Sequence, residues 1–155
     1  MLEFKLIKGI DGYNAVKNIR NEIFSKAHGL SENTDEHDSS AWHIACYDND
    51  KVVASARLYE KEQGIFSIGY VAVSDEYRKQ YIGDTLLRAL EDKAVQLMGY
   101  MIEVDALESA VGFWEKEGYE KCESKLFPDG KIRYEMIKDL TKPFVKCKSC
   151  KQKNQ

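Results

Sequence analysis

The segment from Ile65 to Leu87 constrains the fold of this chain more than any other. It begins with an apolar run, IFSIGYVAV, passes through a short polar turn, and reaches a basic stretch with a glycine that leads directly into a helical pattern. A strand, a turn and a helix in this order place free N–H groups and the positive end of the helix dipole at the turn. Such a turn favours an anion, so the segment predicts a phosphate-binding site.

The remaining patterns predict strands and helices on both sides of this segment. Alternating apolar residues predict a strand at 2–7. Gly9 and the Asp11-Gly12 pair are expected to end this strand, and helical spacing predicts a helix from Tyr13 to Gly29. Further strands are expected at 42–47, 51–59, 65–73, 100–107, 119–127 and 131–140, and further helices at 83–98 and 109–117.

The helix expected at 83–98 permits a parallel connection inside an otherwise antiparallel sheet. It would join the strand at 65–73 to the strand at 100–107. Where two parallel neighbours splay apart, a ligand cleft opens at their carboxyl ends.

Length and charge limit the classes of protein that fit. A chain of 155 residues, with 43% hydrophobic and 32% charged residues, has the size and balance of one soluble domain with its own core. The formal net charge of -3 does not indicate nucleic-acid binding. No apolar run approaches the about 20 residues that span a membrane, and the N-terminus lacks the apolar core of a signal peptide. We therefore expect a cytoplasmic protein with no membrane partner.

The cysteines do not indicate a disulfide framework, since four are too few for a chain of this length. Cys46 and Cys122 lie in strand patterns and are expected to be buried. Cys147 and Cys150 form one C-x-x-C in a lysine-rich tail, 141–155, which we separate from a domain at 1–140. A structural zinc site needs four ligands. We therefore expect an inert tail and no required metal, ahead of a metal shared across a dimer or a redox pair.

An acidic stretch lies between the first helix and the strand at 42–47. It contains Glu32, Asp35, Glu36 and Asp38 and no basic residue. Such a stretch fits a solvated loop, and it equally fits a negative rim that attracts a cationic substrate. Composition does not decide between these two interpretations.

Two motifs give the chain a resemblance to a known family across about residues 1–140. Val71-Ala72-Val73 followed by Arg78 to Gly83, RKQYIG, resembles the strand end and the R-x-x-G-x-G/A turn of the GNAT superfamily of acetyl-CoA-dependent N-acetyltransferases. Phe113 to Tyr119, FWEKEGY, is similar to the family's F-Y-x-x-x-G-F. Residues that resemble an uncharacterised bacterial branch are Arg20, Phe24, Asp35, Asp38, His43 and Ala56-Arg57-Leu58.

The resemblance implies an α/β (α+β) fold with a mixed, mostly antiparallel sheet of six to seven strands and about four helices. A splayed parallel pair would form the cofactor cleft. It implies an acyltransferase that moves an acetyl group from acetyl-CoA to a primary amine, such as a cationic small molecule or a lysine side chain, by direct attack. A monomer or homodimer is expected. The alternative is an acyl-CoA-binding sensor or interaction module with the same fold and little catalysis.

The resemblance also assigns roles to residues. The Val71 backbone is expected to polarise the thioester carbonyl, and the turn that follows is expected to hold the pyrophosphate of coenzyme A. The cofactor-binding residues that it implies are Val71, Ala72, Val73, Arg78, Lys79, Gln80, Tyr81, Ile82, Gly83, Asp84, Thr85, Phe113 and Trp114. The residues expected at the acceptor are Asp35, Asp38, His43 and Arg57, and Arg57 fits an ion pair with the acidic stretch equally well.

Two positions depart from the family pattern. Tyr81 replaces the first glycine of the turn, which requires a negative φ and a ring that points away from the pyrophosphate. Tyr81 and the negative charge of Asp84 together predict weaker cofactor binding. Trp114 stands where the family often has the tyrosine that protonates the leaving thiolate, and an indole is not a usable acid. One of Phe113 and Trp114 is expected to pack in the core.

The catalytic acid and base stay open on the sequence. Tyr119 is our choice of acid, with Tyr81 and Tyr134 as alternatives, and a thiol with a pKa of about 8.5 can also leave without help. Glu103 is our choice of base, because an amine must be neutral to attack, and the alternatives are Asp105, Glu60 and His43.

Overall fold

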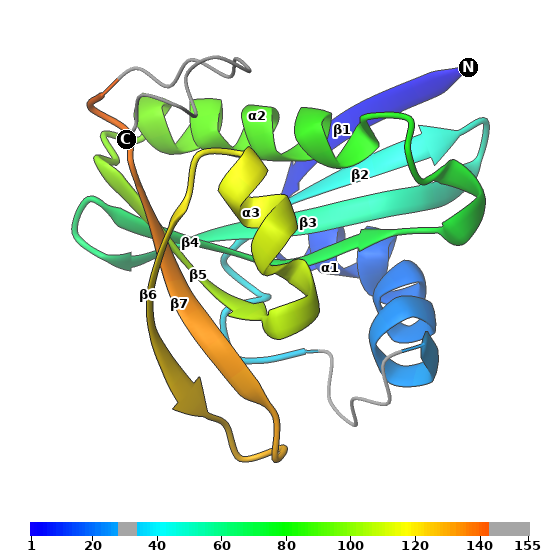
Figure 1. Cartoon of the computed structure of the whole chain (residues 1–155). Coiled ribbons are helices and arrows are strands. Elements are labelled where there is room, and N and C mark those ends of the chain that lie inside the picture. The colour runs from blue at the N-terminus through cyan, green and yellow to red at the C-terminus, as the bar shows by residue number, and fades with distance from the viewer. Residues whose placement is uncertain (28–33, 143–155) are drawn as a thin grey trace.

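A computed structural model describes residues 1–27 and 34–142. Within them, one sheet of seven strands is flanked by three α-helices (Figure 1). The strands are β1 (Leu2–Lys8), β2 (Trp42–Asp48), β3 (Lys51–Glu62), β4 (Ile65–Val73), β5 (Met101–Leu107), β6 (Glu120–Leu126) and β7 (Ile132–Asp139). The helices are α1 (Gly9–Arg20), α2 (Ile82–Gln96) and α3 (Val111–Lys116), with a π-helical segment η1 (Asn21–Ala27) and two 3₁₀ turns, η2 (Asp75–Tyr77) and η3 (Glu108–Ala110).

The element order and the mixed, mostly antiparallel sheet are confirmed. The described residues form three α-helices. The strand order is β1-β2-β3-β4-β5-β7-β6, so the last strand of the sequence lies inside the sheet. None of the described helices is long and apolar enough to cross a membrane.

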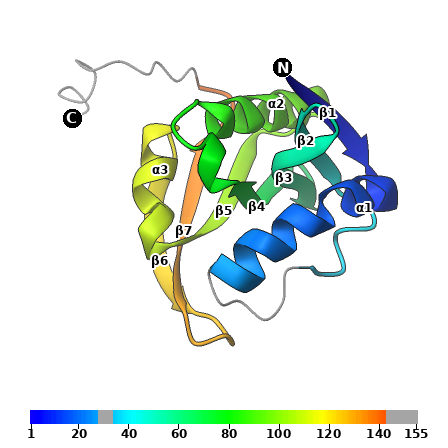
Figure 2. The same cartoon turned by 90° about the vertical axis from the view of Figure 1, so that its right-hand side faces the viewer.

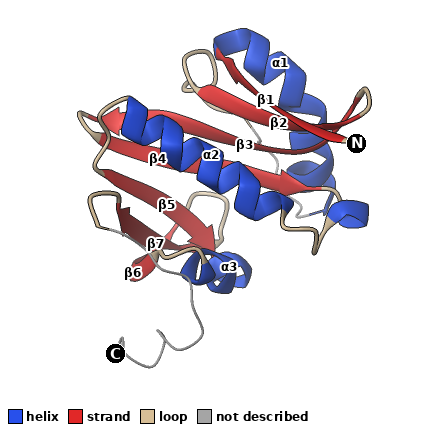
Figure 3. Cartoon of the chain, turned by 90° about the horizontal axis from the view of Figure 1, so that it is seen from above, coloured by secondary structure: helices blue, strands red, loops and turns tan. Residues whose placement is uncertain are grey.

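The pair β4 and β5 is the only parallel one among the described strands, and the two strands soon part. They pair only where Ile65–Ser67 lies beside Met101–Glu103. Beyond these positions β4 continues to Val73 and β5 to Leu107 with no further pairing between them. Figure 3 shows the two strands from above. The expected splayed parallel pair is therefore confirmed.

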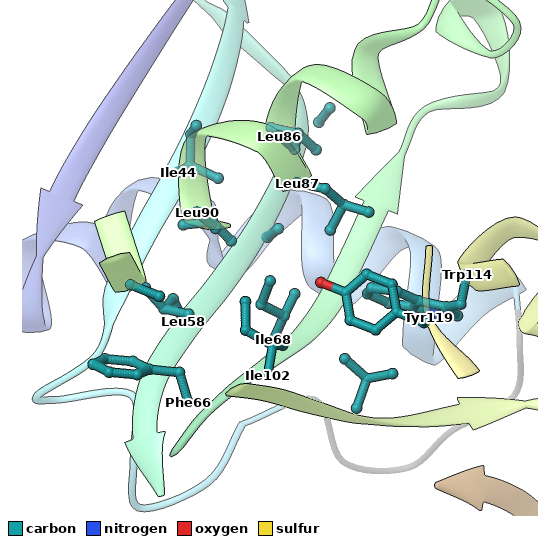
Figure 4. Close-up of a cluster of buried hydrophobic side chains, with 14 of the residues drawn as sticks. Ile44, Leu58, Phe66, Ile68, Leu86, Leu87, Leu90, Ile102, Trp114 and Tyr119 are labelled. Carbon is teal, nitrogen blue, oxygen red and sulfur yellow. The ribbon is translucent and has the colours of Figure 1, made fainter. Parts of the chain in front are cut away.

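Helices cover the two faces of the sheet, with α1 on one face and α2 on the other (Figures 1 and 2). On the α2 face, Leu86 and Leu90 of α2 and Trp114 of α3 share one buried cluster with strand residues (Figure 4). On the α1 face, Val16 and Ile19 form a second, smaller cluster with residues of β2 and β4. This burial of the helical stripes against the sheet supplies the main apolar driving force for the fold.

Helix α1 begins at Gly9 rather than at Tyr13. Its first residues include Gly9 and Gly12, which allow the helix to pack closely on its neighbours rather than separating it from the first strand. A Cβ on Gly12 would lie 2.3 Å from the backbone oxygen of Ile7 and 2.8 Å from Cδ2 of His43. The helix can therefore lie this close to β1 and β2 only with glycine at position 12. The end expected at Gly29 lies outside the described residues.

Strand β6 corrects one expectation about the cysteines. All seven of its residues are exposed, since β7 lies between β5 and β6 and leaves β6 at the edge of the sheet. Cys122 is therefore exposed rather than buried, whereas Cys46 is buried as expected. Cys147 and Cys150, with the rest of the predicted tail after residue 142, lie outside the described residues.

Candidate functional site

The β4–α2 turn, residues 74–81, leads from the end of β4 to an open helix N-terminus. The chain passes through η2 and then takes left-handed backbone conformations at Lys79 (φ 65°) and Tyr81 (φ 62°). Tyr81 is the N-cap of α2 and makes no capping hydrogen bond with its side chain. The first N–H groups of α2 have no partner within the helix, so they are available to an anion.

Tyr81 takes the backbone conformation that a glycine would take, which contradicts the expected negative φ. Its φ of 62° and ψ of 20° are left-handed, a region that costs a side-chain-bearing residue roughly 1–2 kcal/mol. The ring is 77% exposed, so it lies away from the protein surface. The turn therefore keeps the shape of a glycine turn at some cost in stability.

The basic residues of the turn differ in how far they are already engaged. Arg78 Nε donates to the backbone oxygen of Val73 at 3.2 Å, and its guanidinium lies 3.3 Å from Asp75. Lys79 is exposed and forms no ion pair with any residue in the described ranges. Arg78 therefore braces the turn against β4, and Lys79 is the cation that the turn leaves available.

Gly83 lets the start of α2 lie against α3. A Cβ on Gly83 would lie 3.3 Å from Cε1 of Phe113, a tighter approach than most side chains accept. Phe113 is half-buried beside this contact, whereas Trp114 is 6% exposed and belongs to the core. The expectation that one of the two aromatics packs in the core is confirmed for Trp114. Its expected contact with the cofactor is wrong, since its side chain is enclosed by the core.

Tyr119, our expected acid, also lies in the core. It is 3% exposed, packs edge to face on Trp114 (Figure 4), and its hydroxyl donates to Glu91 Oε2 at 2.7 Å. Burial, followed by the negative charge of Glu91, raises the pKa of Tyr119 far above its ordinary value. A buried hydroxyl that holds its proton this firmly cannot protonate a thiolate at the strand end, so that expectation is wrong.

A β-bulge interrupts β4 beyond the last residue that pairs with β5. Ser55 pairs with Ala72 and Arg57 pairs with Gly69, so the single residue Ala56 of β3 lies opposite two residues of β4, Tyr70 and Val71. The extra residue shifts the side-chain alternation by one position. Before the bulge, even-numbered residues of β4 join the core on the α2 face. After the bulge, Val71 and Val73 pack on that face, and Ala72 packs on the α1 face.

The four residues expected at the acceptor are brought together on the α1 face, but most of them are buried. Asp38 accepts from Arg20 at 2.8 Å and from Arg57 at 3.0 Å, and Arg57 also donates to Asp35 at 2.6 Å. Arg20 is 1% exposed and Asp38 and Arg57 are each 4% exposed. We call Arg20, Asp35, Asp38 and Arg57 the buried charge cluster. It contains two positive and two negative charges.

The electrostatics of the cluster are those of a closed ion-pair network. Burial alone would raise the pKa of Asp38, but hydrogen bonds from Arg20 and Thr34 hold it well below its usual range. Burial would lower the pKa of Arg57, and its bonds to Asp35 and Asp38 raise it instead. The acidic stretch is therefore neutralised from within by arginines of α1 and β3, and the negative rim considered for it is not formed by Asp38.

His43 lies in the core and contacts the backbone of Asp38 in the cluster, rather than facing a substrate. It is fully buried, and its Nε2 lies 3.0 Å from the backbone oxygen of Asp38. Burial lowers the pKa of His43, which favours the neutral ring with a proton on Nε2 for this bond. Of the two interpretations open for Arg57, the ion pair is the one observed. The pairing of Arg20 with Asp38 was not predicted, because these two residues meet only in the fold.

Carboxylates gather on the uncovered part of the α1 face, where β5 and β7 run side by side. Glu103 and Asp105 alternate with the buried Ile102 and Val104, so they lie on the opposite face from α2 and α3. Glu103 accepts from Lys61 Nζ at 2.8 Å. Asp105 lies directly opposite Glu135, and neither forms an ion pair with a described residue. Like charges in this position repel each other unless a cation lies between them.

Comparison with known proteins identifies the family to which this arrangement belongs. A profile of the acetyltransferase (GNAT) family matches residues 13–119. The uncharacterised N-acetyltransferase YjcF of Bacillus subtilis (strain 168) is 30% identical over 124 residues, which are 78% of this chain and 88% of that protein.

Solved structures show the same fold at lower sequence identity. Escherichia coli ElaA has a TM-score of 0.77 at 20% identity and covers 90% of this chain and 100% of its own. An acyl-CoA N-acyltransferase from Pseudomonas aeruginosa has a TM-score of 0.75 at 18% identity, covering 89% of this chain and 99% of its own. With the family profile spanning most of the chain, this protein belongs to the GNAT family and is an N-acetyltransferase that uses an acyl-CoA and an amine acceptor.

Proposed function

We propose that this protein transfers the acetyl group of acetyl-CoA to a cationic primary amine by direct attack. The observation that carries the proposal is that β4 parts from β5 after Ser67 and then leads into a turn that ends at a helix N-terminus without a cap from the Tyr81 side chain. Acetyl-CoA supplies the acetyl group as a thioester, and the chain supplies the groups that hold and polarise it. Family membership implies the acyl-CoA but does not specify the acyl group.

The β4–α2 turn fits the pyrophosphate of coenzyme A. The free N–H groups of α2 and the ammonium of Lys79 are complementary to its charge, and the exposed ring of Tyr81 does not cover them. Asp84 in the first turn of α2 opposes this charge, which keeps the expectation of modest affinity.

The end of β4 fits the pantetheine arm and the thioester. Since β5 no longer pairs with β4 after Ser67, an extended arm can bond to the backbone at Val71–Val73 as an added strand would. We assign the Val71 N–H to the thioester carbonyl. One backbone donor aimed at the developing negative charge contributes about 2.7–4 kcal/mol to the rate.

The acceptor side of the proposal rests on the carboxylates of β5 and β7. Asp105 and Glu135 lie opposite each other and form no ion pair with a described residue, although Lys61 on Glu103 is near enough to attract Asp105, so a cationic amine would relieve their repulsion further. Glu103 lies in the last β4–β5 pair, where the strands part, and we propose it as the general base. With Tyr119 buried, we propose that the thiolate leaves without a proton from a side chain.

Calorimetry with the full chain tests the cofactor part. We expect acetyl-CoA to bind, and Lys79→Ala to weaken binding by about threefold to tenfold at low salt, because one charge contact to phosphate is lost. Lys125→Ala on the exposed edge strand β6 is the matched control and should bind as the wild type does. Binding by the wild type weaker than about 1 mM would refute the cofactor assignment.

A thiol-release assay with a panel of amines tests the acceptor part and separates an enzyme from an acyl-CoA-binding sensor. We expect turnover with polyamines, aminoglycosides or lysine peptides. For the amine that reacts, the double variant Asp105→Asn with Glu135→Gln should raise KM by about tenfold, whereas Glu115→Gln on α3 should not. Tight acetyl-CoA binding with no turnover of any amine would favour the sensor. An unchanged KM in the double variant would exclude these carboxylates as the acceptor site.

A further inference from the structure

The bulge in β4 contains one residue, Tyr70, in a backbone conformation that is unfavourable for a residue with a side chain. Tyr70 has a φ of 51°, in the left-handed region, although it carries a large side chain and lies within a strand. Residues with a Cβ enter this region at a cost in free energy and stay there only when their surroundings hold them. The surroundings of Tyr70 must therefore favour this conformation.

Three side chains of the α1 face surround the Tyr70 ring. The guanidinium carbon of Arg20 lies 3.8 Å from the ring centroid, and that of Arg57 lies 4.8 Å from it. Phe24 of η1 packs edge to face at 5.5 Å between ring centroids, with an interplanar angle of 82°. Cations over the face of an aromatic ring and edge-to-face ring pairs are both attractive. The ring is thus held by two arginines that are themselves fixed by Asp38.

The alternation of side chains along β4 shows how these contacts of the Tyr70 ring affect the strand. In regular alternation Tyr70 would follow Phe66 and Ile68 into the core of the α2 face, where both are buried. Instead its ring lies on the α1 face with Arg20 and Phe24. A Tyr70 that returned to regular alternation would place the next residue, Val71, on the wrong face and rotate its peptide group. The position of the Val71 N–H therefore depends on where the Tyr70 ring lies.

We propose that Tyr70 is a positioning residue: its ring, held by Arg20, Arg57 and Phe24, locks the β4 bulge so that the Val71 N–H faces the thioester. This role rests on the proposed function only for the assignment of Val71 to the thioester. The lock itself is a property of the free protein. It connects the buried charge cluster to the reacting end of the cofactor through one aromatic ring.

The lock is tested first without any ligand, by nuclear magnetic resonance of the labelled full chain. Backbone scalar couplings of residue 70 report whether φ is positive. We expect a positive φ in the wild type and in Tyr70→Phe, which keeps the ring, and an averaged or negative φ in Tyr70→Leu, which loses it. Tyr59→Leu is the matched control: Tyr59 also packs on Arg57, at 4.9 Å, but lies in a regular part of β3. It should leave residue 70 unchanged.

The effect on the site is read from the Val71 amide. The difference between the chemical shifts of this amide with acetyl-CoA bound and with coenzyme A bound reports contact with the thioester. We expect this difference in the wild type, Tyr70→Phe and Tyr59→Leu, and its loss in Tyr70→Leu with an unchanged affinity for coenzyme A. If Tyr70→Leu does not fold, Phe24→Leu replaces it, since that variant removes one ring contact and keeps every charge.

The outcomes separate the two proposals. A wild type that binds neither ligand refutes the proposed function and leaves the couplings of residue 70 to decide the lock. A positive φ and a full Val71 shift difference in the ring-deleted or ring-loosened variant would overturn the positioning role, whatever the wild type binds.

Discussion

The β4–α2 turn and the buried charge cluster both gather charged groups, but they are built in different ways. The turn uses backbone N–H groups and exposed side chains that lie within a few residues of one another in the sequence. The cluster uses side chains of α1, the acidic stretch and β3, and hides almost all of them from solvent. Charge in the turn is left available to a ligand, whereas the charges in the cluster are paired with one another inside the fold.

This difference shows that the sign of the net charge of a segment does not reveal its function. The acidic stretch contains the acids expected to attract a cation, yet Asp38 is neutralised by Arg20 and Arg57. The carboxylates that form no ion pair with a described residue, Asp105 and Glu135, lie in strand patterns that give no sign of this in the sequence. What decides the role of a charged group is the partner that the fold brings to it.

The largest effect should come from breaking the cluster. Asp38→Asn leaves two buried guanidinium groups with one carboxylate, and removing one partner of a buried ion pair costs about 3–5 kcal/mol of unfolding free energy. Urea denaturation measures this loss. The matched control is Asp75→Asn, whose pair with Arg78 joins side chains that are 90% and 50% exposed and should contribute little. Equal losses for the two variants would mean that the cluster does not stabilise the fold.

A smaller effect should appear in the pH dependence of stability. Burial lowers the pKa of His43 in the folded state, so below about pH 6.5 the unfolded chain takes up a proton that the folded chain resists. Stability is therefore full above this pH and falls as the pH drops, by up to about 1.4 kcal/mol per pH unit for one proton.

Replacing His43 by glutamine should remove this slope between pH 7 and pH 5. The glutamine amide can still donate to the backbone oxygen of Asp38, but it does not titrate. His37→Gln, at a half-buried position outside the core, is the control and should keep the slope. Denaturation curves at a series of pH values measure it, and an unchanged slope in His43→Gln would contradict the prediction.

The smallest effect should come from the turn, and it should have the opposite sign. Tyr81→Gly removes the cost of a left-handed side-chain-bearing residue and should stabilise the protein by about 1 kcal/mol, with coenzyme A binding unchanged or tighter. Asn49→Gly is the control. Asn49 also has a left-handed backbone, with φ 59°, but asparagine tolerates it better, so the gain should be smaller. A larger gain at Asn49 would show that Tyr81 is not strained.

The sequence predicted the order of elements and the β4–α2 turn because both depend on neighbours in the chain. Periodicity and turn residues act within one element, so the strand at 65–73 was predicted with its observed bounds. Glycine was the main local error. The sequence pattern predicts a break at Gly12, although glycine is needed there for α1 to approach His43 of β2, a contact that sequence spacing does not show.

The parts of the site that could not be predicted depend on distant partners. Nothing near Asp38 in the sequence indicates Arg20, which lies 18 residues away, and the ion pair with Arg57, 19 residues away, was only one of two interpretations. The bulge at Tyr70 is equally hidden, because only the pairing with β3 shows that β4 has an extra residue there. Tyr119 was misjudged for the same reason, since its partner Glu91 lies on α2.

The place of β7 between β5 and β6 has a consequence for synthesis on the ribosome. Strands β1 to β4 can pair as soon as they emerge, because they follow one another in the sheet. Strand β6 is made earlier than β7 but has no neighbour until β7 arrives. The sheet, and with it the half of the site built on β5, therefore matures only after nearly the whole described chain has left the ribosome. Until then β5 exposes an unpaired edge to which other nascent chains can bind.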